Sequence, residues 1–287
     1  MKRVCFLSMD DLSGYVADDE LAIPALADLG WRVETVSWRD TDIDWNAFAA
    51  VIIRTTWDYQ KEPDRFLAVL EQIDNSAARL ENPLETVRWN LSKTYLRDME
   101  RRGSPIVPTI WDAAYTAESF AAWRRDLAAD ELIIKPVVSA TAEHTYRLRE
   151  YDAGLESVFK TREFMVQPFM PAIITSGEFS LFFFGGEFSH AINKSPRPND
   201  FRVQEEHGGI ITAIRPEPSM LRAADKAVKA IDRELLYSRV DLVRDADDNF
   251  LLMELELIEP ALYFRMDERS PKFFAEQFDR RMQRGPE

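Results

Sequence analysis

The chain has 287 residues, of which 46% are hydrophobic, so it is long enough and apolar enough for two or three packed units rather than a disordered chain. Its formal net charge of −14 at pH 7 disfavours nucleic acid as a partner, because binding a polyphosphate backbone depends on clustered Lys and Arg. The N-terminal apolar stretch is too short for a signal peptide, and no run of about 18 apolar residues occurs, so we expect no membrane association and a cytoplasmic location.

Residues 1–85 are predicted to form an open parallel α/β sheet that serves as the substrate domain. Strands are expected in the segments RVCFLS, WRVETVS and AAVIIR, and a helix is expected from about Asp19 to Leu29, ending at Gly30. Strands that alternate with helices imply crossover connections, hence parallel pairing. Cys5 lies in the first strand and, as the one cysteine, is expected to be a buried structural residue.

Two loops of this sheet are candidates for substrate binding. Ligands of open α/β sheets collect at the carboxyl ends of the strands, which here means residues 8–11 and 54–59. Arg54, Asp58 and Tyr59 are therefore predicted to recognise the substrate, although Tyr59 is equally well explained as a packing residue.

Residues 86–168 are predicted to form a smaller lobe. It begins with a helix from about Asn90 to Arg102, ended by Gly103, and continues with strands in VPTIW, ELIIKP and FMVQPF. A helix capped near Thr116 separates the first two strands.

Residues 169–287 are predicted to form a larger lobe that is richer in strands. GEFSLFFF turns through Gly185 and Gly186 into EFSHAINK, and the strand GIITAI follows. A long helix after Ser219, a hairpin formed by SRVDLVR and NFLLMELELIEP, and a final helix complete the chain.

Glu254 and Glu256 carry the clearest chemical signal. Side chains alternate along a strand, so both glutamates are expected on one face together with Phe250 and Leu252. If that face is buried, two ionised carboxylates need a cation or a hydrogen-bonding partner; a metal ion would meet this need, and Asp241 in the preceding strand can supply a third oxygen ligand. An edge strand whose two glutamates face water explains the spacing equally well.

Three lysines are candidates for phosphate binding. Lys135 ends the apolar run LIIKP, from which a cation can reach into a cleft, but such a residue more often faces solvent. Lys93 and Lys194 are similarly ambiguous in so acidic a chain. The sequence contains neither a Walker GxxxxGK[ST] nor a GxGxxG motif, no HExxH or Cys/His cluster, and no GxSxG elbow.

Seven segments follow one another along nearly the whole chain in a characteristic order: NLSKTYLRDMERRGSPIVPT, ELIIKPVVSA, FMVQPFM, GEFSLFFFGGEFSHAINK, FRVQEEHGG, VDLV and ELELIEP. This order resembles the ATP-grasp superfamily, and in particular its glutathione-synthetase-like branch. RTTWDY and ENPLETVRWN further resemble a bacterial subgroup that includes a ring-closing ligase of cycloserine biosynthesis. The resemblance implies an ATP-grasp fold in which two lobes clasp ATP.

The resemblance also implies roles for individual residues. Lys93 and Lys135 would contact phosphates, Glu178 would form part of the nucleotide site, and Arg202 and Lys194 would be catalytic, with Arg202 stabilising charge on the transferred phosphoryl group. The adenine would lie against Gln167, Pro168 and Phe169, and the metal ligands would be Asp241, Glu254 and Glu256. Two features depart from the family: Asn is usual where Glu256 stands, and the loop after Lys135 contains no glycine.

The implied activity is that of a carboxylate–amine ligase, or an intramolecular cyclo-ligase, that uses ATP and one or two Mg²⁺ ions. A small amino-acid-like carboxylate would attack the terminal phosphate of ATP, and an amine would then displace phosphate from the acyl-phosphate. The alternatives are an ATP-grasp kinase and a nucleotide-binding protein without turnover, the latter suggested by the glycine-free loop. A homodimer is compatible with the composition.

Overall fold

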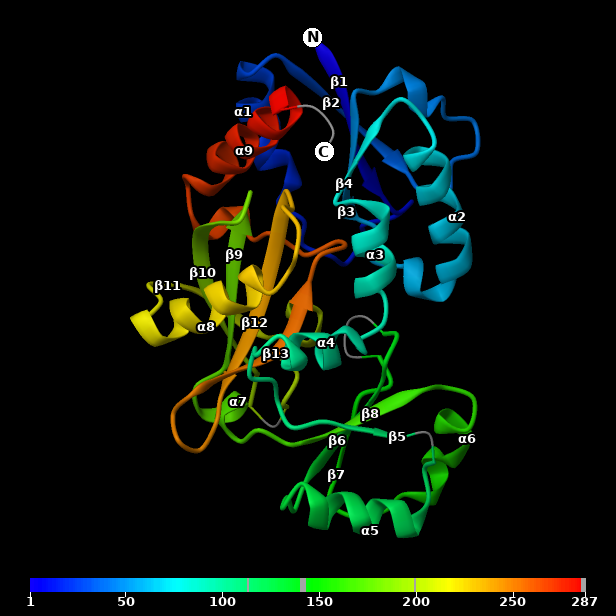
Figure 1. The fold of residues 1–287 in the computed structure, drawn as a ribbon, viewed down its shortest axis with the longest axis vertical. Coiled ribbons are helices and arrows are strands. Elements are labelled where there is room, and N and C mark those ends of the chain that lie inside the picture. The colour runs from blue at the N-terminus through cyan, green and yellow to red at the C-terminus, as the bar shows by residue number, and fades with distance from the viewer. Residues whose placement is uncertain (113, 140–142, 199, 285–287) are drawn as a thin grey trace.

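The computed structural model describes residues 1–112, 114–139, 143–198 and 200–284, and contains three sheets that follow one another along the chain (Figure 1). Their strands fall within residues 2–81, 110–168 and 178–256. The domain boundaries at residues 86 and 169 stay a prediction. No helix in the described ranges is long and apolar enough to cross a membrane.

The first sheet is parallel, as the sequence predicts, with strand order β2-β1-β3-β4. Its strands are β1 (Lys2–Ser8), β2 (Trp31–Ser37), β3 (Ala50–Thr55) and β4 (Arg79–Glu81). Helices α1 (Ile23–Asp28) and α9 (Ser270–Arg284) cover one face, and α2 (Pro63–Asp74) covers the other (Figure 1). Successive residues of β1 alternate between these two cores, and Cys5 is buried in the core of α2, as expected.

The second sheet is antiparallel and has the order β5-β8-β6-β7. Its strands are β5 (Ile110–Asp112), β6 (Leu132–Pro136), β7 (Tyr146–Leu148) and β8 (Phe164–Pro168), and it carries helices α5 (Ala117–Asp126) and α6 (Glu156–Phe159). The Thr116 hydroxyl accepts a hydrogen bond from the Ser119 amide, which confirms the predicted cap of α5.

The third sheet has five antiparallel strands in the order β11-β10-β9-β12-β13. These are β9 (Glu178–Phe184), β10 (Glu187–Ser195), β11 (Ile210–Ile214), β12 (Tyr237–Arg244) and β13 (Phe250–Glu256), with helices α7 (Ala172–Thr175) and α8 (Pro218–Lys229). Gly185 and Gly186 both have positive φ, as the predicted tight turn between β9 and β10 requires. Short 3₁₀ helices span Asp19–Ala22, Trp45–Ala47, Tyr59–Lys61, Ala153–Leu155, Glu205–His207 and Phe264–Met266.

The helix predicted from Asn90 to Arg102 is wrong in its start and continuity. Two helices occupy this region, α3 (Leu84–Asn90) and α4 (Tyr95–Arg101). The Asn90 side chain donates to the Leu255 carbonyl at 2.9 Å and accepts from the Leu257 amide at 3.0 Å, so it ends α3 against the strand β13. Helix α4 packs in the core of the third sheet, although it precedes the second sheet in sequence.

Candidate active site

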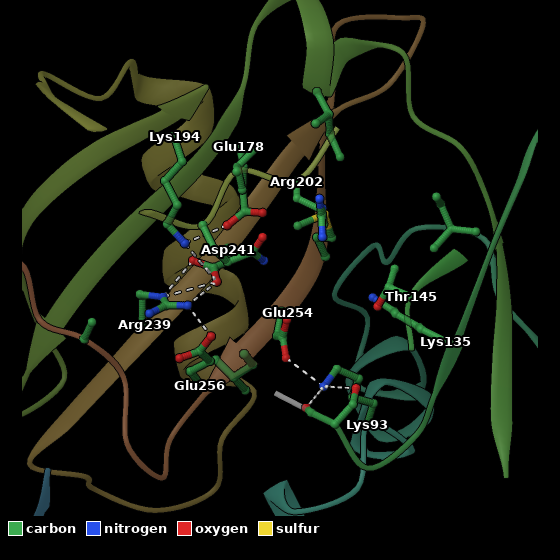
Figure 2. Close-up of a pocket in the computed structure, with 18 of the residues that line it drawn as sticks. Lys93, Lys135, Thr145, Glu178, Lys194, Arg202, Arg239, Asp241, Glu254 and Glu256 are labelled. Carbon is green, nitrogen blue, oxygen red and sulfur yellow. Dashed lines mark hydrogen bonds and ion pairs between the residues drawn. The ribbon is translucent and has the colours of Figure 1, made fainter. Parts of the chain in front are cut away.

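A cleft is lined by residues from all three sheets and their loops. Tyr15, Trp57 and Tyr59 come from the loops after β1 and β3, whereas the second and third sheets contribute most of the charged and polar lining. Figure 2 shows Lys93 and Lys135 reaching this space from one side and Glu178 and Lys194 from the other. Of the residues that the sequence assigns to ATP, metal, catalysis or substrate, those in the lining are Tyr59, Lys93, Lys135, Gln167, Pro168, Phe169, Glu178, Lys194, Arg202, Asp241, Glu254 and Glu256.

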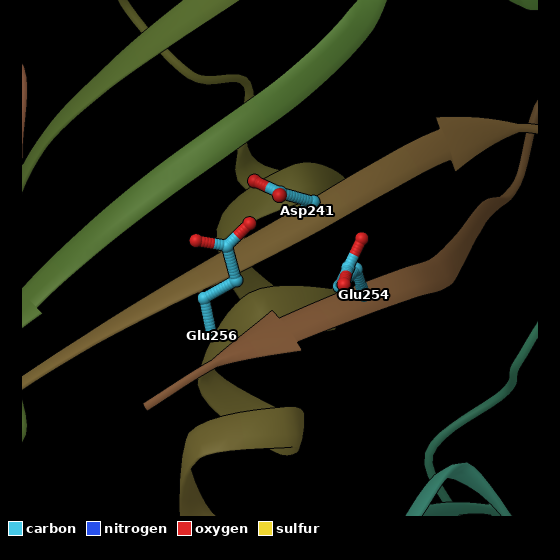
Figure 3. Close-up of side chains that lie close together, drawn as sticks. All are labelled: Asp241, Glu254 and Glu256. Atoms are coloured by element: carbon cyan, nitrogen blue, oxygen red, sulfur yellow. The ribbon is translucent and has the colours of Figure 1, made fainter. Parts of the chain in front are cut away.

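Three acidic side chains converge in the cleft. Each of Asp241, Glu254 and Glu256 has a carboxylate oxygen within 4.8 Å of an oxygen from each of the other two (Figure 3). Asp241 pairs with Glu254 across the β12–β13 ladder, which is why residues 13 positions apart meet. Carboxylate oxygens at this separation are the donors that Mg²⁺ prefers, so the three residues fit a divalent ion.

The alternation expected along β13 is interrupted by a bulge. The ladder pairs Asp241 with Glu254 but Leu242 with Leu252, so Met253 is an extra residue. Phe250 and Leu252 therefore lie in the hydrophobic core with Leu255, whereas Glu254 lines the cleft. The prediction that the glutamates share a face with Phe250 and Leu252 is wrong. The bulge places the apolar and the acidic side chains of β13 on opposite faces, so no metal ion is needed to explain why both kinds occur on one strand.

Arg239 is a central cation of the site that the sequence reasoning missed. Its guanidinium donates to both oxygens of Asp241, at 2.9 to 3.2 Å, and also pairs with Glu256 (Figure 2). Burial opposes ionisation of Asp241, but Arg239 and Lys194 outweigh that effect and lower its pKa. Burial raises the pKa of Glu256 despite Arg239. The alternation of side chains along a strand could have indicated this residue. Arg239 precedes Asp241 by two residues on β12, so both side chains lie on the same face.

Lys194 and Glu178 form a buried pair on neighbouring strands. Their side chains lie 2.7 Å apart, and the Lys194 ammonium is 3.7 Å from Asp241. Burial opposes the charge on Lys194, and the carboxylates of Asp241 and Glu178 reverse this and raise its pKa. Lys194 therefore stays charged beside the acidic cluster, where it can meet a phosphate oxygen.

Lys93 and Lys135 lie on the opposite wall of the cleft. Lys93 donates to the Ser139 carbonyl at 2.7 Å and pairs with Glu254 at 3.1 Å. Burial lowers the pKa of Lys135, Glu254 opposes this effect, and the nearby Lys93 lowers the pKa further. An anion between the two ammonium groups would relieve this repulsion, so the pair suits a phosphate. Part of the glycine-free loop, residues 140–142, lies outside the described residues.

The predicted adenine segment lies at the end of β8. The Gln167 amide donates to the Thr109 hydroxyl at 3.0 Å, and the Phe169 amide donates to the Glu131 carbonyl at 2.8 Å. The guanidinium of Arg147 lies 3.6 Å from the centroid of the Phe169 ring. These bonds hold the segment as a wall of the cleft.

Arg202 lies in the loop between β10 and β11. Its guanidinium pairs with Asp200 at 2.9 Å, and its side chain is 35% exposed, so it is less constrained than Arg239. Gly209 closes this loop: a Cβ atom there would come within 1.9 Å of the Val203 carbonyl oxygen. Arg202 as the main electrostatic catalyst stays a prediction.

The three predicted substrate residues are separated by the fold. Tyr59 lines the cleft and also stacks on Phe66, with ring centroids 4.8 Å apart. Arg54 lies outside the lining, 1% exposed, where it pairs with Asp19 at 2.6 Å and donates to the Pro260 carbonyl at 2.9 Å.

Asp58 also lies outside the lining, since its carboxylate accepts from the Trp38 indole at 2.8 Å and pairs with Arg39. Direct substrate recognition by Arg54 and Asp58 therefore has no geometric support, because both side chains are engaged elsewhere.

Comparisons with known proteins show the family and the fold of the chain. Residues 4–82 match the family model described as D-cycloserine synthetase DcsG, N-terminal domain. The cycloserine biosynthesis protein DcsG of Streptomyces lavendulae is 31% identical over 280 residues, covering 91% of this chain and 92% of that protein. The crystal structure of D-cycloserine synthetase DcsG matches with a TM-score of 0.83 and 27% identity over 98% of this chain and 99% of the other.

More distant solved structures share the fold. The ATP-grasp ligase PsnB, complexed with a minimal precursor, Mg and ADP, matches with a TM-score of 0.66 and 15% identity over 98% of both chains. D-alanine–D-alanine ligase from Bacillus anthracis matches with a TM-score of 0.67 and 13% identity over 99% of this chain and 98% of that one. The predicted α/β ATP-grasp fold is confirmed. The chain belongs to the DcsG family of ATP-grasp enzymes and is an ATP-dependent ligase.

Proposed function

We propose that this enzyme activates the carboxylate of a small amino-acid-like substrate as an acyl-phosphate and transfers the acyl group to an amine. The amine belongs either to a second substrate or to the same molecule, in which case the product is a ring, as the name of the relative DcsG suggests. The observation that carries the proposal is one cleft in which three convergent carboxylates face four cations, Lys93, Lys135, Lys194 and Arg239.

The residues on both walls would position the phosphates of ATP. Lys93 and Lys135 would hold phosphate oxygens from one side, while Lys194 and Arg239 would face them from the other. Mg²⁺ bound by Asp241, Glu254 and Glu256 would neutralise phosphate charge. Because Arg239 pairs with two of these carboxylates, we expect it to turn toward the transferred group when the ion binds.

The proposed reaction has two steps. An oxygen of the substrate carboxylate attacks the terminal phosphorus, the bond from that phosphorus to the oxygen bridging to ADP breaks, and ADP leaves. The amine nitrogen attacks the acyl carbon, loses a proton, and phosphate departs. Water must be kept out because an acyl-phosphate hydrolyses, and the apolar lining residues Leu91, Ile258 and Met253 favour its exclusion.

The first test is ATP binding by calorimetry with and without Mg²⁺, in the wild type and in a Glu254→Ala, Glu256→Ala double variant. We expect Mg²⁺-dependent binding that the double variant loses. Carboxylates are then screened for ADP release, with hydroxylamine present to trap an acyl-phosphate as a hydroxamate.

Each rival function gives its own result in this screen. A stable phosphorylated product that forms without an amine would identify a kinase, and tight ATP binding without ADP release would identify a protein without turnover. The cytoplasmic location and the homodimer stay predictions.

A further inference from the structure

Glu259 occupies the end of the cleft that faces the first sheet. It follows β13 by three residues and lines the cleft. Its carboxylate lies beside the hydroxyl of Tyr59 and raises the pKa of that hydroxyl, and the indole of Trp57 donates to its main-chain carbonyl at 2.9 Å. The ring of Tyr15 lies 5.4 Å from that of Trp57. We name these four residues the Glu259 cluster.

Among the described residues, Glu259 differs from the other buried or partly buried acids of the cleft in having no ion pair. Glu254 pairs with Lys93, Glu256 with Arg239, and Glu178 with Lys194. For the Glu259 carboxylate, the part of the chain that the structure describes supplies a tyrosine hydroxyl but no ion pair. A partly buried carboxylate without a cation is costly to ionise.

The surroundings of Glu259 would accommodate a positive charge. Burial, and then the neighbouring Glu256, raise the pKa of Glu259 to about 8 against the weaker opposing influence of Lys93 and Arg239. A cation beside Glu259 would oppose both effects, since it stabilises the ionised carboxylate. The aromatic rings around it also attract cations through their faces. A second carboxylate at this position would instead be repelled.

We propose that the Glu259 cluster binds the ammonium group of the substrate whose carboxylate is activated, which makes Glu259 the residue that selects an amino acid over the corresponding hydroxy acid. The inference rests on the proposed ligase function, because that function places a substrate between the phosphate-binding residues and the first sheet. Trp57 and Tyr59 come from the loop after β3, so the substrate loop predicted from the sequence would act through these two residues together with Glu259.

The test compares matched pairs of ligands that differ only in the charged group. Alanine and serine of both configurations are titrated against lactate and glycerate of the same configurations, by calorimetry, with Mg²⁺ and a non-hydrolysable ATP analogue present. In the wild type we expect at least one amino acid to bind at least 100-fold more tightly than its hydroxy acid.

In a Glu259→Gln variant, which keeps a similar side-chain size and a polar end group but removes the charge, we expect this preference to fall at least tenfold. The affinity for the ATP analogue should stay unchanged, which shows that the variant is folded. Glu268→Gln, a change at an exposed residue outside the cleft lining, is the control and should keep the full preference.

The outcomes separate this inference from the ligase proposal. If no amino acid binds more tightly than its hydroxy acid, or if Glu259→Gln keeps the preference, Glu259 does not select an ammonium group. A Glu259→Gln variant that lowers kcat for ADP release and leaves KM for the amino acid unchanged would also overturn the inference. That result would indicate that Glu259 accepts a proton during the reaction. Amino-acid binding that depends on Glu259 but never leads to ADP release would refute the proposed acyl-phosphate chemistry on such a substrate and leave this inference standing.

Discussion

Replacing Arg239 with methionine should destabilise the protein in the absence of Mg²⁺ and make its stability depend strongly on that ion. The Arg239 side chain is 8% exposed and pairs with Asp241, which is 2% exposed, and with Glu256, which is 29% exposed. The variant would leave both carboxylates beside Glu254 without their main cation. Repulsion among three acids then adds to the cost of their burial.

The size of this effect can be worked out from the contacts. Removing one partner of a buried ion pair costs about 3 to 5 kcal/mol. Because Asp241 keeps its ion pair with Lys194 and the hydrogen bond that Ser180 donates, and Glu256 is partly solvated, we expect a loss of about 3 kcal/mol. For a chain of this length the melting temperature falls by about 2 °C per kcal/mol, hence by about 6 °C.

The assay is thermal unfolding with and without saturating MgCl₂. Arg239 competes with the ion for the same oxygens, so Mg²⁺ should raise the melting temperature of the variant more than that of the wild type. Arg280→Met, at a side chain that is 50% exposed, serves as a control and should change stability by no more than about 0.5 kcal/mol. If Mg²⁺ stabilises both proteins equally, the three carboxylates do not form the metal site.

Three further changes test other parts of the structure. Lys135→Met should weaken ATP binding at least tenfold in calorimetry, whereas Lys229→Met at an exposed helix position should not, and equal affinities would remove Lys135 from the phosphate site. Burial lowers the pKa of His190 to about 4, so the folded protein binds fewer protons than the unfolded chain below about pH 6.5 and loses stability as the pH falls toward 4. Between pH 7 and pH 5, denaturant titration should show a loss in unfolding free energy that is about 2 kcal/mol larger in the wild type than in His190→Phe. The same loss in both proteins would show that the pKa of His190 is not lowered. Gly209→Ala should slow ADP release by displacing the loop that carries Arg202, with little change in melting temperature, and full activity would show that the loop tolerates the clash.

Local patterns were sufficient for the elements that form through short-range interactions. The alternation of apolar strands and helices predicted the parallel first sheet, and Gly185 with Gly186 predicted the β9–β10 turn. The Thr116 cap was also correct because a cap depends on the few residues that follow it. The helix around Asn90 was misplaced because bonds to the distant Leu255 and Leu257 end α3 there.

The site shows what the sequence by itself determined about this protein. The order of segments along the chain carried the ATP-grasp assignment, and the spacing of Glu254 and Glu256 with a preceding Asp241 indicated the acidic cluster. These features are local or ordered along the chain, so they can be recognised without coordinates.

Only the tertiary structure decided which groups meet across the cleft. The bulge at Met253 separates the glutamates from the apolar residues of the same strand, and a bulge depends on pairing with a neighbouring strand. Arg239 became part of the site through its contacts with residues of two strands, and Arg54 is held outside the cleft lining by its ion pair with Asp19. Glu259 stands out because the described residues give its carboxylate no ion pair. Charge pairing in a folded protein depends on distances between segments far apart in sequence, and local patterns carry no information about those distances.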